Sequence, residues 1–297
     1  MGLFSEYKKT LKLVETEEPI DLFINRPLGF LFMKLVYNTS LTPNHISTFS
    51  GILGAIAGVF FAYKNSSIHI TGVIILFLGM VLDCADGQLA RAKKNGTKFG
   101  HVIDAFYDYI TSIFVYGGMA IYLWTTGYKT VIFSFTISGW MWFALMMVAG
   151  FSTMLHSLLV DGAKNVFTAI VNKTDSNYFK IKYEEYSKGL EEVKSRGKGF
   201  FTRLPYTTYL NYLDIQIKSL NYQSEIDAEK FRKKNRIIML LWMLIGPTNH
   251  LVAAIVCVLF NRYDLFIWLL IVPFNILTLI LWIAQKIVNG EKKAIEK

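Results

Sequence analysis

Six long stretches of the sequence contain no Asp, Glu, Lys or Arg, and they constrain the fold more than any other feature. They are residues 46–63, 65–82, 109–128, 130–160, 237–261 and 265–285. A helix needs about 20 mostly apolar residues to cross a bilayer, and all six stretches are near or above that length. Charged residues make up only 18% of the chain, against roughly 25% in an ordinary soluble protein. The sequence therefore predicts an all-α integral membrane bundle of six transmembrane helices.

The positive charges are distributed unevenly among the segments that connect these stretches. Of the 31 Lys and Arg residues, 28 lie in alternate segments, and only Lys64, Lys129 and Arg262 lie in the others. Cytoplasmic loops carry an excess of Lys and Arg, so we expect a multi-pass protein with both termini in the cytoplasm. In a prokaryote this membrane would be the cell (inner) membrane. The net charge of +9 then reflects contact with membrane lipids, and we expect no nucleic-acid partner.

The polar segments define the organisation of the chain. We expect an N-terminal cytoplasmic region with an interfacial amphipathic helix in residues 1–40, a six-helix transmembrane domain in residues 41–290 with a cytoplasmic insertion at 162–235, and a cytoplasmic tail at 291–297.

Two parts of the N-terminal region differ in character. Residues 1–18 are polar, and we expect them to be loose. Residues 19–40 are too short and too charged to span a membrane, but apolar residues crowd one side. They predict a helix that begins near Pro27 and lies in the interface, with Arg26 and Lys34 reaching toward the headgroups.

Proline and glycine mark expected features of the bundle. Pro247 and Pro273 lie near the middle of the last two apolar stretches and predict kinks. Small residues allow close contact between membrane helices, and we expect this role for the glycines at 51, 54, 58, 117 and 118.

Aspartates at the edge of the second and third stretches point to chemistry. Ionised residues at membrane depth are costly and are a functional hypothesis by default. One helical face carries Asp83, Asp86, Gly87, Ala90 and Arg91, and the next carries Gly100, Asp104 and Asp108. Two antiparallel helices joined by a short turn would bring the four carboxylates together.

Four neighbouring carboxylates would repel one another unless cations were bound. Oxygen-only ligands suit Mg²⁺ or Mn²⁺. Gly87 and Ala90 leave room for a ligand, and Arg91 offers a planar fork for phosphate. These are the parts for phosphate chemistry on metal ions. The alternative is a buried ion-pair network in which Arg91 and Lys98 balance the acids.

The spacing Asp-x2-Asp-Gly-x2-Ala-Arg-x8-Gly-x3-Asp-x3-Asp, from Asp83 to Asp108, resembles the signature of the CDP-alcohol phosphotransferases at all eight fixed positions. The wider resemblance covers about residues 20–290. The upstream segment Thr42-Pro43-Asn44-His45-Ile46-Ser47 resembles the family's Pro-Asn-x-x-Thr segment before the first span, with Ser47 where Thr is usual.

The resemblance implies an enzyme that transfers a substituted phosphate group from a CDP-alcohol to an acceptor alcohol and releases CMP, as the homodimer expected of the family. The charge distribution places its active site at the cytoplasmic side of the membrane. Two ions, Mg²⁺ or Mn²⁺, would be held by Asp83, Asp86, Asp104 and Asp108. Asp108 would also be the catalytic base. The nucleotide would be bound by Asn44, Ser47, Asp83, Gly87, Ala90, Arg91 and Thr97.

Other readings of the aspartates stay open at this point. A prenyltransferase also uses Asp-rich metal motifs, but it needs two separated motifs and more spans. A cation transporter could use the same acids as an ion site, although the chain shows no internal repeat. His156 and Arg236 are candidate acceptor-binding residues, each with a packing or membrane-edge alternative. The sequence does not identify the alcohols.

Overall fold

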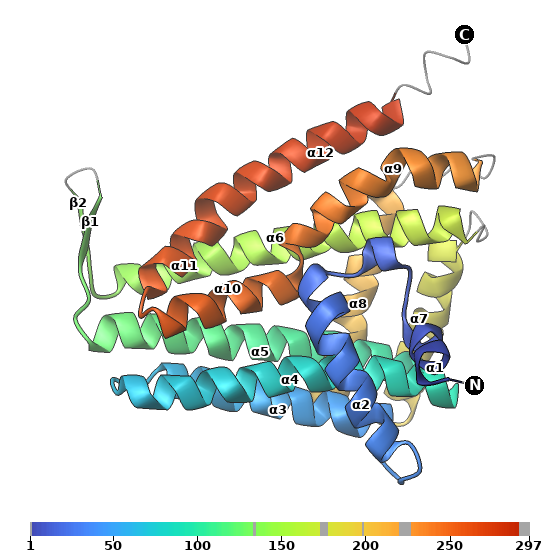
Figure 1. Ribbon diagram of the computed structural model, residues 1–297, viewed down its shortest axis with the longest axis horizontal. Coiled ribbons are helices and arrows are strands. Elements are labelled where there is room, and N and C mark those ends of the chain that lie inside the picture. The colour runs from blue at the N-terminus through green and yellow to red at the C-terminus, as the bar shows by residue number, and fades with distance from the viewer. Residues whose placement is uncertain (1, 133–134, 173–177, 198, 220–226, 291–297) are drawn as a thin grey trace.

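The computed structural model describes residues 2–132, 135–172, 178–197, 199–219 and 227–290 (Figure 1). The described chain is mostly helical, and the tail expected at 291–297 lies outside it. Its α-helices are α1 (Leu3–Thr10), α2 (Arg26–Val36), α3 (Pro43–Phe61), α4 (Ser66–Lys93), α5 (Lys98–Thr125), α6 (Met141–Val171), α7 (Tyr178–Ser195), α8 (Phe200–Ser219), α9 (Ala228–Trp242), α10 (Pro247–Leu259), α11 (Tyr263–Leu269) and α12 (Asn275–Gly290). Shorter elements are the helical turns η1 (Val14–Thr16), η2 (Asp21–Asn25), η3 (Met243–Ile245) and η4 (Leu270–Phe274), and the strands β1 (Thr130–Ile132) and β2 (Phe135–Ile137).

Within the described residues, four helices are long and apolar enough to cross a membrane. They are Pro43–Phe61, Ser67–Lys93, Met141–Val171 and Tyr263–Asn289, and the bent pair of α9 and α10 makes a fifth. Their outer faces carry large exposed apolar side chains such as Phe151 and Phe260, which suits contact with lipid. These features support a multi-pass membrane protein. The expected third span corresponds to α5, which is not among these helices, so six spans are not confirmed.

Helices α3, α4 and α5 run side by side along the molecule (Figure 1). Glycines make the contact between α3 and α5 close. A Cβ atom at Gly58 would lie 2.2 Å from the carbonyl carbon of Phe114, and one at Gly118 would lie 1.9 Å from the carbonyl oxygen of Gly58. The predicted glycine contacts are therefore confirmed at Gly58 and Gly118, whereas a Cβ at Gly117 would meet nothing within 4 Å.

The kink predicted at Pro247 is confirmed, whereas the kink at Pro273 stays a prediction. The helix pair Ala228–Ile245 and Pro247–Leu259 bends by 42°, because Gly246 has an extended backbone and Pro247 starts a new helix. Pro273 lies inside the π-helical turn η4, between α11 and α12, where the missing proline N–H widens the helix locally.

The fourth apolar stretch does not form one helix, contrary to the prediction for residues 130–160. Strands β1 and β2 pair antiparallel at Thr130–Ile137, and α6 begins only at Met141. The stretch starts with β-branched and aromatic residues, which favour strands, and Gly139 adopts a left-handed backbone (φ +57°) before the helix. Helix α6 then continues to Val171, so the first residues of the expected insertion extend this helix.

The N-terminal region differs from the prediction that residues 1–18 are loose. Residues 10–20, which we call the N-terminal strap, contact α6 and α9 through the turn η1, and Glu15, Glu17 and Glu18 are at most 5% exposed. Glu15 pairs with Arg232 of α9 at 2.8 Å. Glu17 pairs with Arg26 at 2.8 Å. A partner elsewhere in the bundle offsets the cost of burying each acid, and these pairs hold the strap in place.

Helix α2 begins with Arg26 and Pro27, close to the predicted start. Its buried face carries Phe30 and Met33, while Leu35 is 80% exposed. Arg26 is buried against Glu17 rather than reaching toward headgroups, so that prediction is wrong. The position of α2 in the membrane interface stays a prediction.

Helices α7 and α8 lie in the expected insertion and cross the bundle (Figure 1). Their aromatic side chains, including Tyr186 and Tyr206, bury Val102 of α5 to 1% exposure. The insertion therefore packs on the first turns of the helix that carries Asp104.

Candidate active site

A short turn joins α4 to α5 and sets the geometry of the site. Lys94 ends α4 in a left-handed conformation with φ +52°, a common way to stop a helix. Thr97 then caps α5, because its hydroxyl accepts the backbone N–H of Gly100 at 2.9 Å. The chain reverses within four residues, and the two helices run antiparallel as the spacing predicts.

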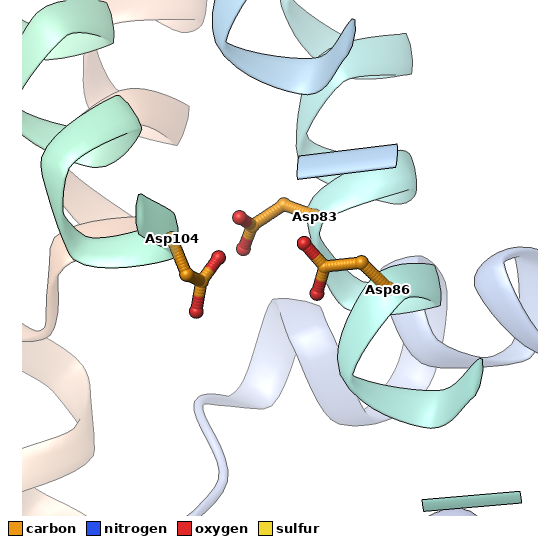
Figure 2. A group of neighbouring side chains, drawn as sticks. All are labelled: Asp83, Asp86 and Asp104. Atoms are coloured by element: carbon orange, nitrogen blue, oxygen red, sulfur yellow. The ribbon is translucent and has the colours of Figure 1, made fainter. Parts of the chain in front are cut away.

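Three of the four predicted metal ligands converge at this junction. One carboxylate oxygen each from Asp83, Asp86 and Asp104 lies within 4.8 Å of the other two (Figure 2). Asp86 is buried and the other two are half-buried. Among the described residues, no Lys or Arg forms an ion pair with any of the three.

This arrangement fits a divalent cation. Three carboxylates close together and without a basic partner repel one another when ionised, and a bound cation removes that cost. The donor set consists of oxygen alone, which Mg²⁺ and Mn²⁺ prefer. The ion-pair network considered above is not supported at Arg91, which forms no ion pair with these acids among the described residues, and the side chain of Lys98 lies outside the described part of the structure.

Asp108 differs from the other three aspartates. It lies outside the group of converging oxygens and its side chain is exposed. It still interacts electrostatically with Asp83, Asp104 and Asp86, and with Asp161 of α6. Asp108 therefore lies near the cluster without being one of its converging ligands.

The first turns of α3 contribute polar groups on the other side. Ser47 is buried, and its hydroxyl donates a short hydrogen bond to a carboxylate oxygen of Asp86. A Cβ atom at Gly100 would lie 2.7 Å from Oδ1 of Asn44 and 3.1 Å from the Thr97 hydroxyl. Glycine at this position therefore lets Asn44 and Thr97 come together at the start of α5.

Arg91 extends from the same end of α4, one turn after Gly87. Its Nε donates to the carbonyl oxygen of Thr10 at 2.6 Å. Its Nη2 is buried and has no hydrogen-bond partner. A Cβ at Gly87 would lie 3.3 Å from Nη1 of Arg91, so glycine keeps the guanidinium face uncrowded, and Ala90 adds only a methyl group beside it.

Comparison with known proteins agrees with this geometry. Residues 40–181 match the family model described as CDP-alcohol phosphatidyltransferase. The matched region spans α3 to α6 and contains all four aspartates of the signature.

Two curated relatives match part of the chain. The archaetidylinositol phosphate synthase of Pyrococcus horikoshii is 30% identical over 108 residues, which are 35% of this chain and 56% of the relative. The phosphatidylinositol phosphate synthase of Mycobacterium marinum is 32% identical over 79 residues, which are 27% of this chain and 33% of the relative. The chain thus spans about half the length of the first relative and a third of the second.

The two predicted acceptor residues are not part of the group of converging aspartates. His156 is fully buried, and its ring nitrogens lie 3.3 Å from Nε2 of His250 and 3.1 Å from Oδ1 of Asn275. Arg236 is exposed on α9, outside the matched region. The interhelical hydrogen bonds considered for His156 are present, and an acceptor role for either residue stays a prediction.

Sequence reasoning missed the charged residues that surround the CDP-alcohol phosphatidyltransferase motif. Asp161 and Lys164 lie on the part of α6 that follows the apolar stretch. Nζ of Lys164 lies 3.6 Å from Oε1 of Glu18 in the strap. Lys12 of the strap interacts electrostatically with Asp104. No local pattern marks Lys12 and Lys164, because Asp104 and Glu18 lie more than 90 positions away from them.

Proposed function

We propose that this protein transfers a substituted phosphate group from a CDP-alcohol to an acceptor alcohol and releases CMP, in phospholipid synthesis. The observation that carries the proposal is the convergence of Asp83, Asp86 and Asp104 inside the region that matches the CDP-alcohol phosphatidyltransferase family model. Transferases of substituted phosphate groups need cations beside the phosphates, and this cluster supplies ligands for them.

The aspartates of α4 and α5 would hold two divalent ions, Mg²⁺ or Mn²⁺, with Asp108 completing the set. When bound, such ions neutralise phosphate oxygens and acidify a bound hydroxyl. Ser47 holds the carboxylate of Asp86 in one orientation through its hydrogen bond. The protein therefore prepares the ligand geometry before substrate binds.

The nucleotide end of the donor would lie between the α3 and α4 sides of the site. Asn44 and Thr97, which come together at Gly100, are placed to donate or accept hydrogen bonds there. Arg91 would contact the diphosphate through its unpartnered Nη2, and Gly87 leaves space for this approach.

In the transfer itself, the oxygen of the acceptor hydroxyl forms a bond to the β-phosphorus, and the bond from that phosphorus to the CMP oxygen breaks. The hydroxyl proton goes to the carboxylate of Asp108, which is exposed beside the cluster and not part of the converging group. CMP leaves with the bonding electron pair.

The acceptor and the lipid are not fixed by the motif. The donor is either CDP-diacylglycerol, with a polar alcohol or alcohol phosphate as acceptor, or a CDP-linked head group, with a lipid as acceptor. Both relatives have inositol phosphate in their names, so inositol phosphate belongs among the first acceptors tested. Six spans, a cytoplasmic site and a homodimer are part of the same proposal.

The test uses purified protein in lipid-detergent micelles with a panel of CDP donors and acceptors, scored by CMP and lipid product. We expect activity with Mg²⁺ or Mn²⁺, none in a chelator, and recovery when the metal is restored. Asp83→Asn and Asp104→Asn should abolish CMP release without changing the elution profile, whereas Glu229→Gln, on the exposed face of α9, should not. Full activity in the chelator would refute the proposal, and ion flux without CMP release would favour a transporter.

A further inference from the structure

The N-terminal strap reaches the end of α4 that carries the nucleotide-binding residues. The carbonyl oxygen of Thr10 accepts from Nε of Arg91 at 2.6 Å. The hydroxyl of Thr10 accepts from Nε2 of Gln88 at 3.2 Å, and Gln88 is fully buried. Two hydrogen bonds therefore fix the start of the strap against α4, one turn from Gly87.

Lys12 lies two residues after Thr10, and its positive charge is not neutralised by an ion pair among the described residues. Its backbone N–H donates to Oε1 of Glu17 at 3.3 Å, but among the described residues its ammonium has no hydrogen-bond or ion-pair partner. The side chain is exposed. Glu17, the acid of the strap that interacts electrostatically with Lys12, is already bound to Arg26 at 2.8 Å.

Several basic groups surround Lys12, and two of them already have acidic partners. Lys12 interacts electrostatically with Arg26, Arg91 and Lys164 and with the acid Glu17, and also with Asp104 of the metal cluster. Arg26 is paired with Glu17 and Lys164 with Glu18, which leaves Lys12 and Arg91 without an ion pair among the described residues. Like charges held together cost free energy unless an anion binds between them. Arg91 also keeps Nη2 buried without a partner, which is a cost that an anion would remove.

We propose that Lys12 is a second diphosphate-binding residue, which contacts the CDP moiety of the donor together with Arg91. The proposal rests on the proposed function and extends the nucleotide site from helices α3, α4 and α5 to the strap. A flexible ammonium and a planar guanidinium beside the metal ligands together match a diphosphate, whose charge is spread over two groups of oxygens.

The competing explanation is that Lys12 only balances the charge of Asp104. The two explanations predict opposite effects on binding. Removal of a balancing charge would strengthen Mg²⁺ binding by the aspartates and leave nucleotide affinity unchanged. Removal of a phosphate ligand would weaken binding of phosphate-bearing nucleotides and leave the nucleoside unaffected.

The experiment measures binding of CDP and of cytidine to the full-length protein in micelles with Mg²⁺, by isothermal titration calorimetry. Lys12→Gln should weaken CDP binding roughly 10-fold, the loss expected for one charge-assisted hydrogen bond, with no change for cytidine. Lys12→Arg should restore most of the affinity. Lys8→Gln, on exposed α1 with its ammonium over the ring of Phe4, is the matched control and should bind CDP normally.

The possible results separate the role of Lys12 from the proposed function of the protein. Unchanged CDP affinity in Lys12→Gln, or an equal loss in Lys8→Gln, would overturn the role of Lys12 while leaving the enzyme assignment intact. No Mg²⁺-dependent CDP binding by the unsubstituted protein would instead refute the proposed function. Melting temperatures of all variants, measured in the same micelles, show whether a loss of binding comes from misfolding.

Discussion

At the scale of single residues, the aspartates of one motif have different surroundings. Asp86 is buried and receives a hydrogen bond from Ser47, whereas Asp108 is exposed and lies outside the converging group. A ligand that is held by its neighbours is suited to binding a metal, and one that is free to meet an acceptor is suited to proton transfer. We therefore expect substitution of a converging aspartate and substitution of Asp108 to have different effects on CDP binding and on turnover.

Asp108→Asn should lower the rate of CMP release by roughly 10²–10⁴-fold, the usual contribution of general base catalysis. Its CDP affinity should fall far less than that of Asp83→Asn, because Asp83 is one of the three converging ligands. Turnover and CDP binding, measured for both variants with Mg²⁺, check this. An equal loss of CDP binding would make Asp108 a metal ligand without a separate base role.

Glu18 gives the fold a pH dependence. Burial raises the pKa of its carboxyl to about 7, well above the value in an unfolded chain. Between these two pKa values the folded protein holds a proton that the unfolded chain has released, so this stabilisation is full at acid pH and is lost as pH rises through 7. The shift corresponds to about 3 kcal/mol.

Glu18→Gln should therefore remove a pH dependence rather than a fixed amount of stability. We expect the melting temperature of the unsubstituted protein, relative to the variant, to fall between pH 5 and pH 8. Glu229→Gln changes an exposed pair with Lys233 and should shift the melting temperature equally at both pH values. Parallel curves for Glu18→Gln and the unsubstituted protein would contradict the assignment.

At the scale of elements, the contact between α3 and α5 depends on which face each glycine occupies. Gly118→Ala would push a methyl group against the backbone oxygen of Gly58, and should destabilise the protein by roughly 1–3 kcal/mol. Gly117→Ala meets nothing within 4 Å and should be neutral or stabilising by up to about 1 kcal/mol, since alanine favours a helix. Heating followed by size-exclusion chromatography in micelles compares the two, and equal losses would refute this account of the contact.

Elements with a local pattern could be predicted from the sequence, and those without one could not. The spacing of Asp83 to Asp108 repeats the helical period, so the antiparallel pair of α4 and α5 followed directly. The pair β1–β2 was missed because an apolar run has the same composition in a strand and in a membrane helix. The strap was missed because Glu15 and Glu18 find their partners on α9, α6 and α10, and a run of acids usually indicates a solvated segment.

At the scale of the whole molecule, the distribution of Lys and Arg predicts which end faces the cytoplasm. Lys129, before β1, and Lys188, on α7, are both exposed, and the two native cysteines are buried. In intact cells, Lys129→Cys should react with a membrane-impermeant thiol reagent, and Lys188→Cys should react only after lysis. The reverse pattern would place the aspartates on the outer side, away from cytoplasmic CDP donors.

The strap also has a consequence for how the chain is made. Glu15 and Arg232 are separated by 217 positions, and Glu18 and Asn249 by 231. The ribosome synthesises the strap long before α9 and α10. These acids therefore leave the ribosome without their partners and stay in water through most of translation. Docking of the strap on α9 and α10 is then a late step of biogenesis, and a nascent chain stalled before α9 would carry the complete aspartate motif without the docked strap.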